Sequence, residues 1–214
     1  MRLSLLNKRR FENFKSNKRG WYSFWIFSFL FVISIFADFI SNDKPLLIKY
    51  ESNIYFPIIY EYSEKIFGGD FETEADYLDP FVKKLINDKG FMVWPIIPYS
   101  YDTIIKDLGL PAPSPPSSKN WLGTDDQARD VLARLIYGFR ISILFGFTLT
   151  FFSMIIGVSA GAIQGYFGGK IDLFFQRFME IWSAIPTLYV LIILASIVQP
   201  NFWWLLSILL LFSW

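Results

Sequence analysis

The chain contains neither cysteine nor histidine among its 214 residues. Without Cys it has no disulfide, thiolate nucleophile or Cys-ligated metal, and without His it has no imidazole base, His-ligated metal or serine-type triad as usually built. No acid, base and nucleophile converge elsewhere in the sequence. We therefore expect no catalytic residue, no metal site and no cofactor, and the chain is not predicted to be an enzyme.

Charge is also scarce, at 18% of residues, and 20 Lys and Arg against 19 Asp and Glu leave a net charge of +1. That balance provides no basic field to hold nucleic acid, so no nucleic-acid partner is expected. Hydrophobic residues make up 53% of the chain and aromatic residues 20%. Soluble domains are about a quarter charged, so this composition predicts an all-α membrane protein with several spans and the lipid bilayer as a partner.

Residues 21–40 carry no charge before Asp38 and reach the roughly 20 residues that cross a bilayer. Seven Lys or Arg precede them, against Glu12 alone, which by the positive-inside rule keeps the N-terminus in the cytoplasm. The tripeptide 36–38 is not a signal-peptidase site, so this first span is predicted to be retained.

Three further apolar runs follow. The run 181–198 contains Pro186, which is either a gating kink or a tolerated one. The last run follows the turn signal Gln199-Pro200-Asn201 and has 13 residues, about 20 Å of helix. That length predicts either the truncated start of a fourth span in a longer protein or an interfacial stub. The expected order along the chain is a basic cytoplasmic tail 1–20, transmembrane helix 21–40, periplasmic insert 41–118, periplasmic interfacial helix 119–140, transmembrane helix 141–163, cytoplasmic loop 164–180, transmembrane helix 181–198 and the start of a fourth transmembrane helix 202–214.

The insert is rich in aromatics and Pro, with a strand-like piece at 54–60 and a polyproline-type linker at 111–116. It is small for an independent core, so we expect it to lie on the membrane or on a partner. Its acidic run 70–79 alternates like a calcium loop but has Ala75 at the turn glycine and Phe81 at the twelfth position. Residues 68–72 only scramble a diguanylate cyclase signature. A solvated acidic face is the prediction here.

Residues 120–142 read NWLGTDDQARDVLARLIYGFRIS. Thr124 and Gln127 match a capping box, followed by acids suited to a helix N-terminus, so a helix is predicted to start here. Asp130 and Arg134 are spaced to pair at i,i+4 on its polar face. The expected apolar face comprises Val131, Leu132, Leu135, Ile136 and Phe139. One interpretation is an anchoring helix with snorkelling arginines.

The same segment resembles the GTDxxGRDxxSRxIYGxRxS signature of C-type permease subunits in oligopeptide and dipeptide ABC importers. The matching residues are Gly123, Thr124, Asp125, Arg129, Asp130, Arg134, Ile136, Tyr137, Gly138, Arg140 and Ser142. The resemblance continues through residues 165–169, Asp172 and 177–186, and residues 125–127, the insert and 182–191 look like the Yej-type branch, associated with oligopeptide and microcin C uptake. Ala128 and Ala133 stand where the family has Gly and often Ser, and we expect both to leave a helix intact.

The resemblance implies a polytopic helical permease of the bacterial inner membrane that works by alternating access. It implies a second permease subunit, cytoplasmic ATPase subunits that hydrolyse ATP, a periplasmic substrate-binding protein and a peptide substrate. The coupling loop of the family would begin after Trp214. The residues expected to orient the second span, or only to cap and anchor it, are Asp125, Arg129, Asp130, Arg134 and Arg140.

Two other functions stay open. An ion-coupled secondary transporter or channel is disfavoured because 141–163 and 181–198 contain no charged residue. The second open function is a non-transporting membrane anchor or assembly protein. Ser153, Gly157, Gly161 and Gly165 recur every four residues, a small-residue stripe on which another helix can approach closely. The stripe is interpreted either as a fixed packing seam or as a sliding contact.

Overall fold

The computed structural model describes residues 5–199 and 201–213. Arg2 of the basic tail, Pro200 of the turn signal and Trp214 of the last apolar run lie outside the described residues. The chain divides into two compact units, Met1–Arg140 and Ile141–Trp214.

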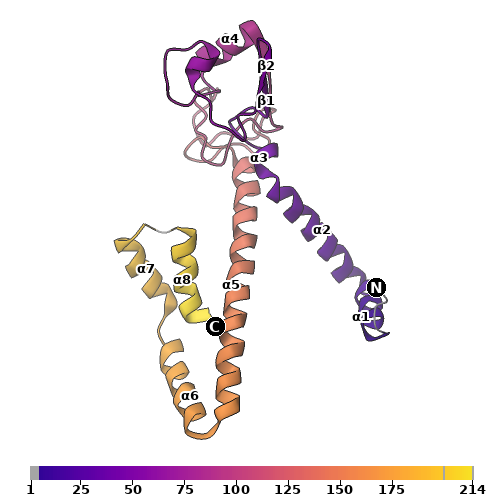
Figure 1. Cartoon of the computed structure of the whole chain (residues 1–214), viewed down its shortest axis with the longest axis vertical. Helices are drawn as coiled ribbons and strands as arrows, with labels where there is room; N and C mark the ends of the chain where they lie inside the picture. The colour runs from indigo at the N-terminus through magenta and orange to yellow at the C-terminus, as the bar shows by residue number, and fades with distance from the viewer. Residues whose placement is uncertain (1–4, 200, 214) are drawn as a thin grey trace. The chain divides into compact units, whose positions relative to one another are not determined.

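The first unit begins with helices α1 (Leu5–Ser16), α2 (Lys18–Ile35) and the short α3 (Ala37–Ile40) (Figure 1). The break after α1 lies at Asn17, whose side chain accepts a hydrogen bond from the Gly20 amide at 3.3 Å. The predicted first span thus falls on α2 and α3, with an interruption at Phe36. In the turn before that break, the Ser34 hydroxyl donates to the Phe31 carbonyl at 2.7 Å, a local bond that bends helices.

The insert contains a three-stranded antiparallel sheet in the order β2-β1-β3, so the all-α prediction is wrong for this part. Its strands are β1 (Leu47–Tyr50), β2 (Asn53–Tyr55) and β3 (Gly90–Val93). A 3-10 turn, η1 (Glu64–Phe67), and helix α4 (Pro80–Lys89) pack nearby. Strands of three or four residues are too short for their alternation to be distinguished from irregular chain.

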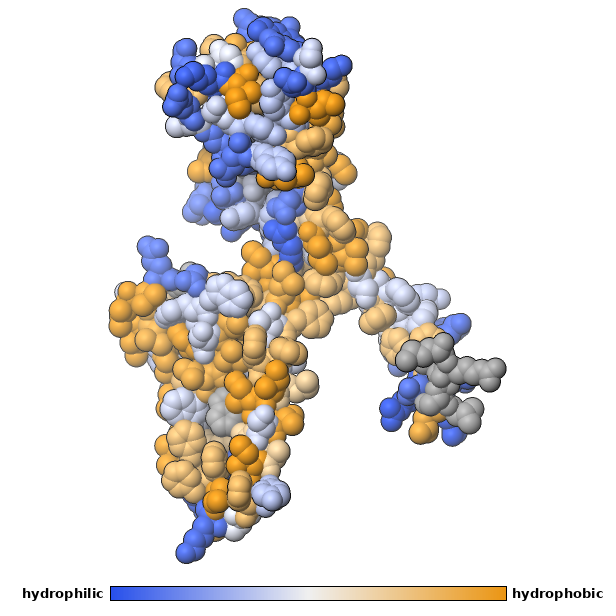
Figure 2. Space-filling model, viewed as in Figure 1, coloured by the Kyte–Doolittle hydropathy of each residue, from blue (hydrophilic) through white to orange (hydrophobic). Residues whose placement is uncertain are grey.

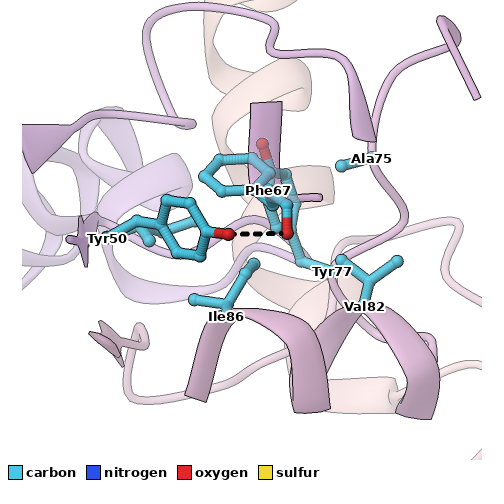
Figure 3. Close-up of a cluster of buried hydrophobic side chains, with 7 residues drawn as sticks. Tyr50, Phe67, Ala75, Tyr77, Val82 and Ile86 are labelled. Atoms are coloured by element: carbon cyan, nitrogen blue, oxygen red, sulfur yellow. Dashed lines mark hydrogen bonds between the residues drawn. The ribbon is translucent and has the colours of Figure 1, made fainter. Parts of the chain in front are cut away.

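A hydrophobic core holds the insert together, contrary to the expectation that it has none of its own. The buried side chains are Ile48, Tyr50, Phe67, Ala75, Tyr77, Val82 and Ile86. Figure 3 shows Ile86 and Val82 of α4 directed toward Phe67 and Tyr77, with the Tyr50 hydroxyl donating to the Phe67 carbonyl at 3.1 Å. Aromatic side chains bury large areas each, which lets few residues close this core.

Helix α5 (Val131–Phe167) has 37 residues, about 55 Å of helix, and its first ten residues belong to the first unit. Among the described residues it is the one helix long and apolar enough to cross a membrane by itself. It contains the predicted second span and extends beyond it on both sides.

The second unit holds the rest of α5 with α6 (Gly169–Ser183), α7 (Thr187–Ile197) and α8 (Phe202–Ser213). The predicted loop at 164–180 is therefore largely helical, with its turn confined to Gly168 and Gly169, both at positive φ. Figure 2 shows hydrophobic side chains over much of the visible face of these helices.

The predicted third span is broken at Pro186, which precedes α7 at its N-cap position. Proline has no amide hydrogen and disfavours helix at the residue before it, so α6 ends at Ser183 and α7 begins at Thr187. The two helices are bent by 63° and qualify as a membrane span only as a broken pair or a re-entrant loop. Helix α8 returns to α6, where the Trp182 ring nitrogen donates to the Leu211 carbonyl at 2.6 Å.

Candidate functional site

The candidate site is the segment 120–130 together with the N-terminal end of α5. This segment is a folded loop, and the helix begins at Val131 and not at Thr124 as the capping-box pattern predicted. The Thr124 hydroxyl accepts from the Ser114 amide at 2.9 Å, and the Thr124 amide donates to the Ser114 carbonyl at 3.0 Å. The proline-rich linker therefore occupies the groups that would have capped a helix at Thr124.

Gly123 makes this close approach possible. Its φ is +74°, and a Cβ at this position would lie 2.4 Å from the Ser114 carbonyl oxygen. Both the left-handed backbone and the lack of space exclude any larger residue. The family glycine at 123 thus lets the linker lie directly against the loop.

Asp125 organises the loop from its centre. One carboxylate oxygen accepts from the amides of Gln127 and Arg129, each at 2.9 Å. The other accepts from Arg129 Nε at 2.9 Å and from the guanidinium of Arg134. Arg134 therefore pairs with Asp125, and the predicted Asp130–Arg134 pair is wrong. Desolvation raises the pKa of Asp125, but these hydrogen bonds outweigh it and lower the pKa to about 2.

Asp130 is buried, with 1% of its surface exposed, although the sequence pattern placed it on a polar outer face. One oxygen accepts from the Ala133 amide at 2.8 Å, as a helix N-cap does, and the other accepts from the Asn120 side chain at 2.8 Å. A buried carboxylate needs such partners. Asn120, ten residues upstream, carries no signal in the sequence that identifies it as this partner.

Ala128 lies in the loop at a φ of +61°. This left-handed conformation is unfavourable for residues with a Cβ and favourable for glycine. Its carbonyl accepts from the Ile105 amide at 3.0 Å, which ties the loop to the insert. The expectation that Ala128 sits in a helix is wrong, and the geometry gives the physical reason for a family glycine here.

A second cluster fixes α5 to the end of the first helical segment. The Tyr137 hydroxyl lies 2.9 Å from an Asp38 carboxylate oxygen and 2.7 Å from the Ser41 carbonyl. Arg140 donates to the other Asp38 oxygen at 2.8 Å, and its guanidinium lies 4.8 Å from the centre of the Tyr137 ring. No pattern in the sequence predicted this contact. The only signal was a carboxylate at the end of an otherwise uncharged run.

The buried face of this part of α5 is not the predicted apolar stripe. Ala133 and Tyr137 are 0% and 4% exposed, whereas Leu135 is 56% exposed. The inward residues follow Asp130 at helical spacing and face the insert and Asp38. The other four residues of the predicted stripe, Val131, Leu132, Ile136 and Phe139, are half-buried, and the Phe139 ring lies 5.9 Å from the Phe27 ring of α2.

The remaining predicted site residues take no part in these clusters. Gly138 and Ser142 are exposed on α5. In the second unit, a Cβ added at Gly161 or Gly165 would meet no atom of the described residues within 4 Å. Gly157 is half-buried, and the Ser153 hydroxyl is buried without a hydrogen-bond partner among the described residues. At its two terminal glycines, therefore, the stripe packs against no described helix.

The acidic side chains of the run 70–79 form ion pairs and a helix cap. Glu72 pairs with Lys65 at 2.9 Å, and Glu74 pairs with Lys44. Asp79 caps α4 by accepting from the Phe81 amide at 2.7 Å. Within the described ranges no group of three or more acidic residues could hold a metal ion.

The candidate site connects separate parts of the chain, and we call it the joint. The carboxylates of Asp38, Asp125 and Asp130 each accept a hydrogen bond from a side chain elsewhere in the sequence. The arrangement fixes the insert, the linker and the end of the first helical segment to one end of α5.

Comparison with known proteins finds peptide-transport permeases similar to this chain. Residues 6–66 match the family described as the N-terminal TM domain of oligopeptide transport permease C. The chain is 51% identical over 213 residues to the inner membrane ABC transporter permease protein YejE of Escherichia coli, covering 100% of this chain and 62% of that protein.

Two further relatives extend the comparison. The peptidoglycan transport system permease protein YejE of Agrobacterium fabrum is 50% identical over 231 residues, covering 97% of this chain and 60% of that protein. The dipeptide transport system permease protein DppC of Haemophilus influenzae is 46% identical over 80 residues, 37% of this chain and 27% of that protein. The chain thus spans about 60% of the length of the two YejE proteins. It belongs to the oligopeptide-type permeases of ABC importers, within their Yej branch.

Proposed function

We propose that this chain forms part of the translocation pathway of an ATP-driven importer for oligopeptides or peptide-like compounds. The observation that carries the proposal is the 51% identity to an ABC transporter permease through the whole chain. The chain's own part is to open and close the pathway by alternating access. Hydrolysis of ATP then belongs to a separate cytoplasmic subunit.

The proposed topology places the N-terminus in the cytoplasm and the insert 41–118 in the periplasm, with a multi-pass arrangement in the inner membrane. The basic residues before Trp21 support the orientation through the positive-inside rule. The apolar length of α5 supports a span that begins near Ile141.

The proposed partners are a second permease subunit, ATPase subunits and a periplasmic substrate-binding protein. No charged residue lies within 141–163 or 181–198, which favours an external energy source over an ion-coupled site at the membrane midplane. The proposed substrates are oligopeptides, including microcin C-type compounds. The Agrobacterium relative is named for peptidoglycan transport, so peptides carried on peptidoglycan fragments form a second substrate class to test.

The joint has a defined role in this proposal. Residues Asp125, Arg129, Asp130, Arg134 and Arg140 hold the outer end of α5 against the insert and Asp38. A substrate-binding protein that docks on the insert would then act directly on the second span. In this proposal the interfacial segment 119–140 transmits the docking of the substrate-binding protein to the translocation pathway.

The proposal is tested by uptake of labelled tri- and pentapeptides in cells that carry the native transporter. Uptake should stop when the ATPase subunits are deleted and persist when a protonophore collapses the ion gradient over a short assay. The reverse pattern would assign the chain to an ion-coupled carrier. If uptake depended on neither treatment and the insert were still required for assembly of a partner, the chain would be a membrane anchor.

The joint is tested separately by Arg134→Gln, which removes one guanidinium from Asp125. We expect reduced peptide uptake with normal amounts of chain in the membrane. Lys119→Gln is the matched control, because Lys119 is exposed near the same loop and forms no ion pair within the described ranges. Unchanged uptake in Arg134→Gln would leave the joint with an anchoring role only.

A further inference from the structure

The basic segment around α1 is the most strongly charged part of the described chain. Its basic residues are Lys8, Arg9, Arg10, Lys15, Lys18 and Arg19, and its one acidic residue is Glu12. All of these side chains are exposed. Across residues 5–199 and 201–213, no ion pair involves any of the six cations. The segment thus presents unpaired positive charge on a chain whose net charge is only +1.

Aromatic rings hold α1 against the beginning of α2. The rings of Phe11 and Trp21 lie 5.8 Å apart, and Phe14 lies 5.6 Å from Trp21. Phe11 and Trp21 are ten residues apart, which would separate them by about 15 Å along a continuous helix. The chain therefore turns at Asn17, where ψ is 85°, and α1 folds back on the start of α2.

This fold places the cations around the end of the predicted first span, which begins at Trp21. Trp and Tyr side chains concentrate at membrane interfaces, and the aromatic cluster of α1 and α2 supplies such residues at the same level. Leu6 remains 70% exposed. It lies one turn before the exposed Arg9 and Arg10, so an apolar side chain stands beside two of the cations. Figure 2 shows hydrophilic and hydrophobic side chains side by side in this region.

We propose that α1 is an interfacial helix that binds anionic phospholipid headgroups, with its exposed cations on the phosphates and Leu6 in the upper acyl region. Basic clusters immediately beside a span bind anionic lipid in this way, and the attraction falls off within a Debye length. The occupant is lipid because the charge lies directly beside the span and has no protein partner in the described chain. The inference rests on the proposed first span but does not depend on transport.

The test uses the full chain in nanodiscs. Because the chain contains no Cys, Leu6→Cys provides a single site for an environment-sensitive NBD fluorophore. Titration of phosphatidylglycerol into phosphatidylcholine discs should shift NBD emission to the blue, and 0.5 M NaCl should reverse much of the shift. The double variant Arg9→Gln/Arg10→Gln should weaken the association by roughly 25-fold, at about fivefold per cation.

Two controls make the result specific. Arg9→Lys/Arg10→Lys keeps both charges and should stay within about twofold of the parent chain, since the attraction is to charge near the surface. Lys83→Gln/Lys84→Gln removes two charges from α4 in the insert and should change nothing. Equal emission with and without phosphatidylglycerol, or a shift that requires added ATPase subunits and ignores the lipid, would overturn the proposal. Neither result depends on whether peptides are carried.

Discussion

At the scale of single residues, Ala128 holds a backbone conformation that its side chain opposes. Its φ of +61° is a left-handed value, which costs an L-residue about 1–2 kcal/mol. Glycine avoids this cost but loses more chain entropy on folding. We expect Ala128→Gly to stabilise the chain by about 0.5–1 kcal/mol, measured as a higher midpoint of thermal unfolding in detergent.

Ala133→Gly is the matched control for that substitution. Ala133 is fully buried in the first turn of α5, where glycine costs about 1 kcal/mol relative to alanine. The two substitutions should therefore move the unfolding midpoint in opposite directions. A decrease for both would contradict the left-handed role assigned to residue 128.

The Asp125 carboxylate gives the loop a pH dependence. Its pKa falls from an ordinary value of 3.8 to about 2 because the folded state donates hydrogen bonds to the ionised form. A lowered pKa means that the stabilisation is present above about pH 4 and is lost as the pH falls toward 2. Asp125→Asn should lower the unfolding midpoint at pH 6 and flatten its dependence between pH 4 and 2. Asp126→Asn changes an exposed neighbour and should give the same dependence of the unfolding midpoint on pH as the parent chain. If Asp125→Asn gave a pH dependence parallel to that of the parent chain, the stabilising role of the ionised Asp125 would be contradicted.

At the scale of elements, Asp38 and Arg140 connect two helical segments that are far apart in the sequence. Their side chains are 46% and 22% exposed, so the pair is partly desolvated. Removing either partner, as Asp38→Asn or Arg140→Gln, should cost about 1–2 kcal/mol, because a charge-assisted hydrogen bond is lost at the Tyr137 cluster.

The exchanged variant Asp38→Arg/Arg140→Asp tests whether the two charges interact with each other. The single variants Asp38→Arg and Arg140→Asp should each lower the unfolding midpoint, and the exchanged variant should recover part of that loss. Additive losses in the exchanged variant would show that the two residues act independently. The measurement is thermal unfolding of the purified chain, with peptide uptake as a second readout.

Sequence periodicity and motifs predicted the elements unevenly, for physical reasons visible at particular residues. The long apolar run of α5 was predictable because its length and lack of charge have few other interpretations. The start of α5 was not predictable, because Thr124 forms a hydrogen bond with Ser114 of the linker, a contact that no local pattern encodes. The short strands around Ile48 and the contact of Asp38 with Arg140 likewise depend on tertiary packing. The family signature singled out Thr124, Asp130 and Arg140, but it does not contain their partners Ser114, Asn120 and Asp38.

At the scale of the whole molecule, we predict that the glycine stripe of α5 is a surface for association. Helices in membranes pack closely through small residues, and a bulky residue prevents that approach. A Cβ added at Gly161 or Gly165 would meet no atom of the described residues within 4 Å. Both positions are therefore open among the described residues, and we predict that a helix of the proposed second permease subunit packs there.

Gly161→Leu/Gly165→Leu should leave the unfolding midpoint of the isolated chain unchanged or slightly higher, since leucine favours helix over glycine by about 1 kcal/mol per position. The same substitutions should reduce copurification with the second permease subunit and abolish peptide uptake, because the helix backbones can no longer approach. Ser159→Leu, at an exposed position on the side of α5 opposite the stripe, should affect neither measurement. Normal copurification and uptake in the double variant would show that the stripe faces lipid, and the small residues would then have no role in assembly.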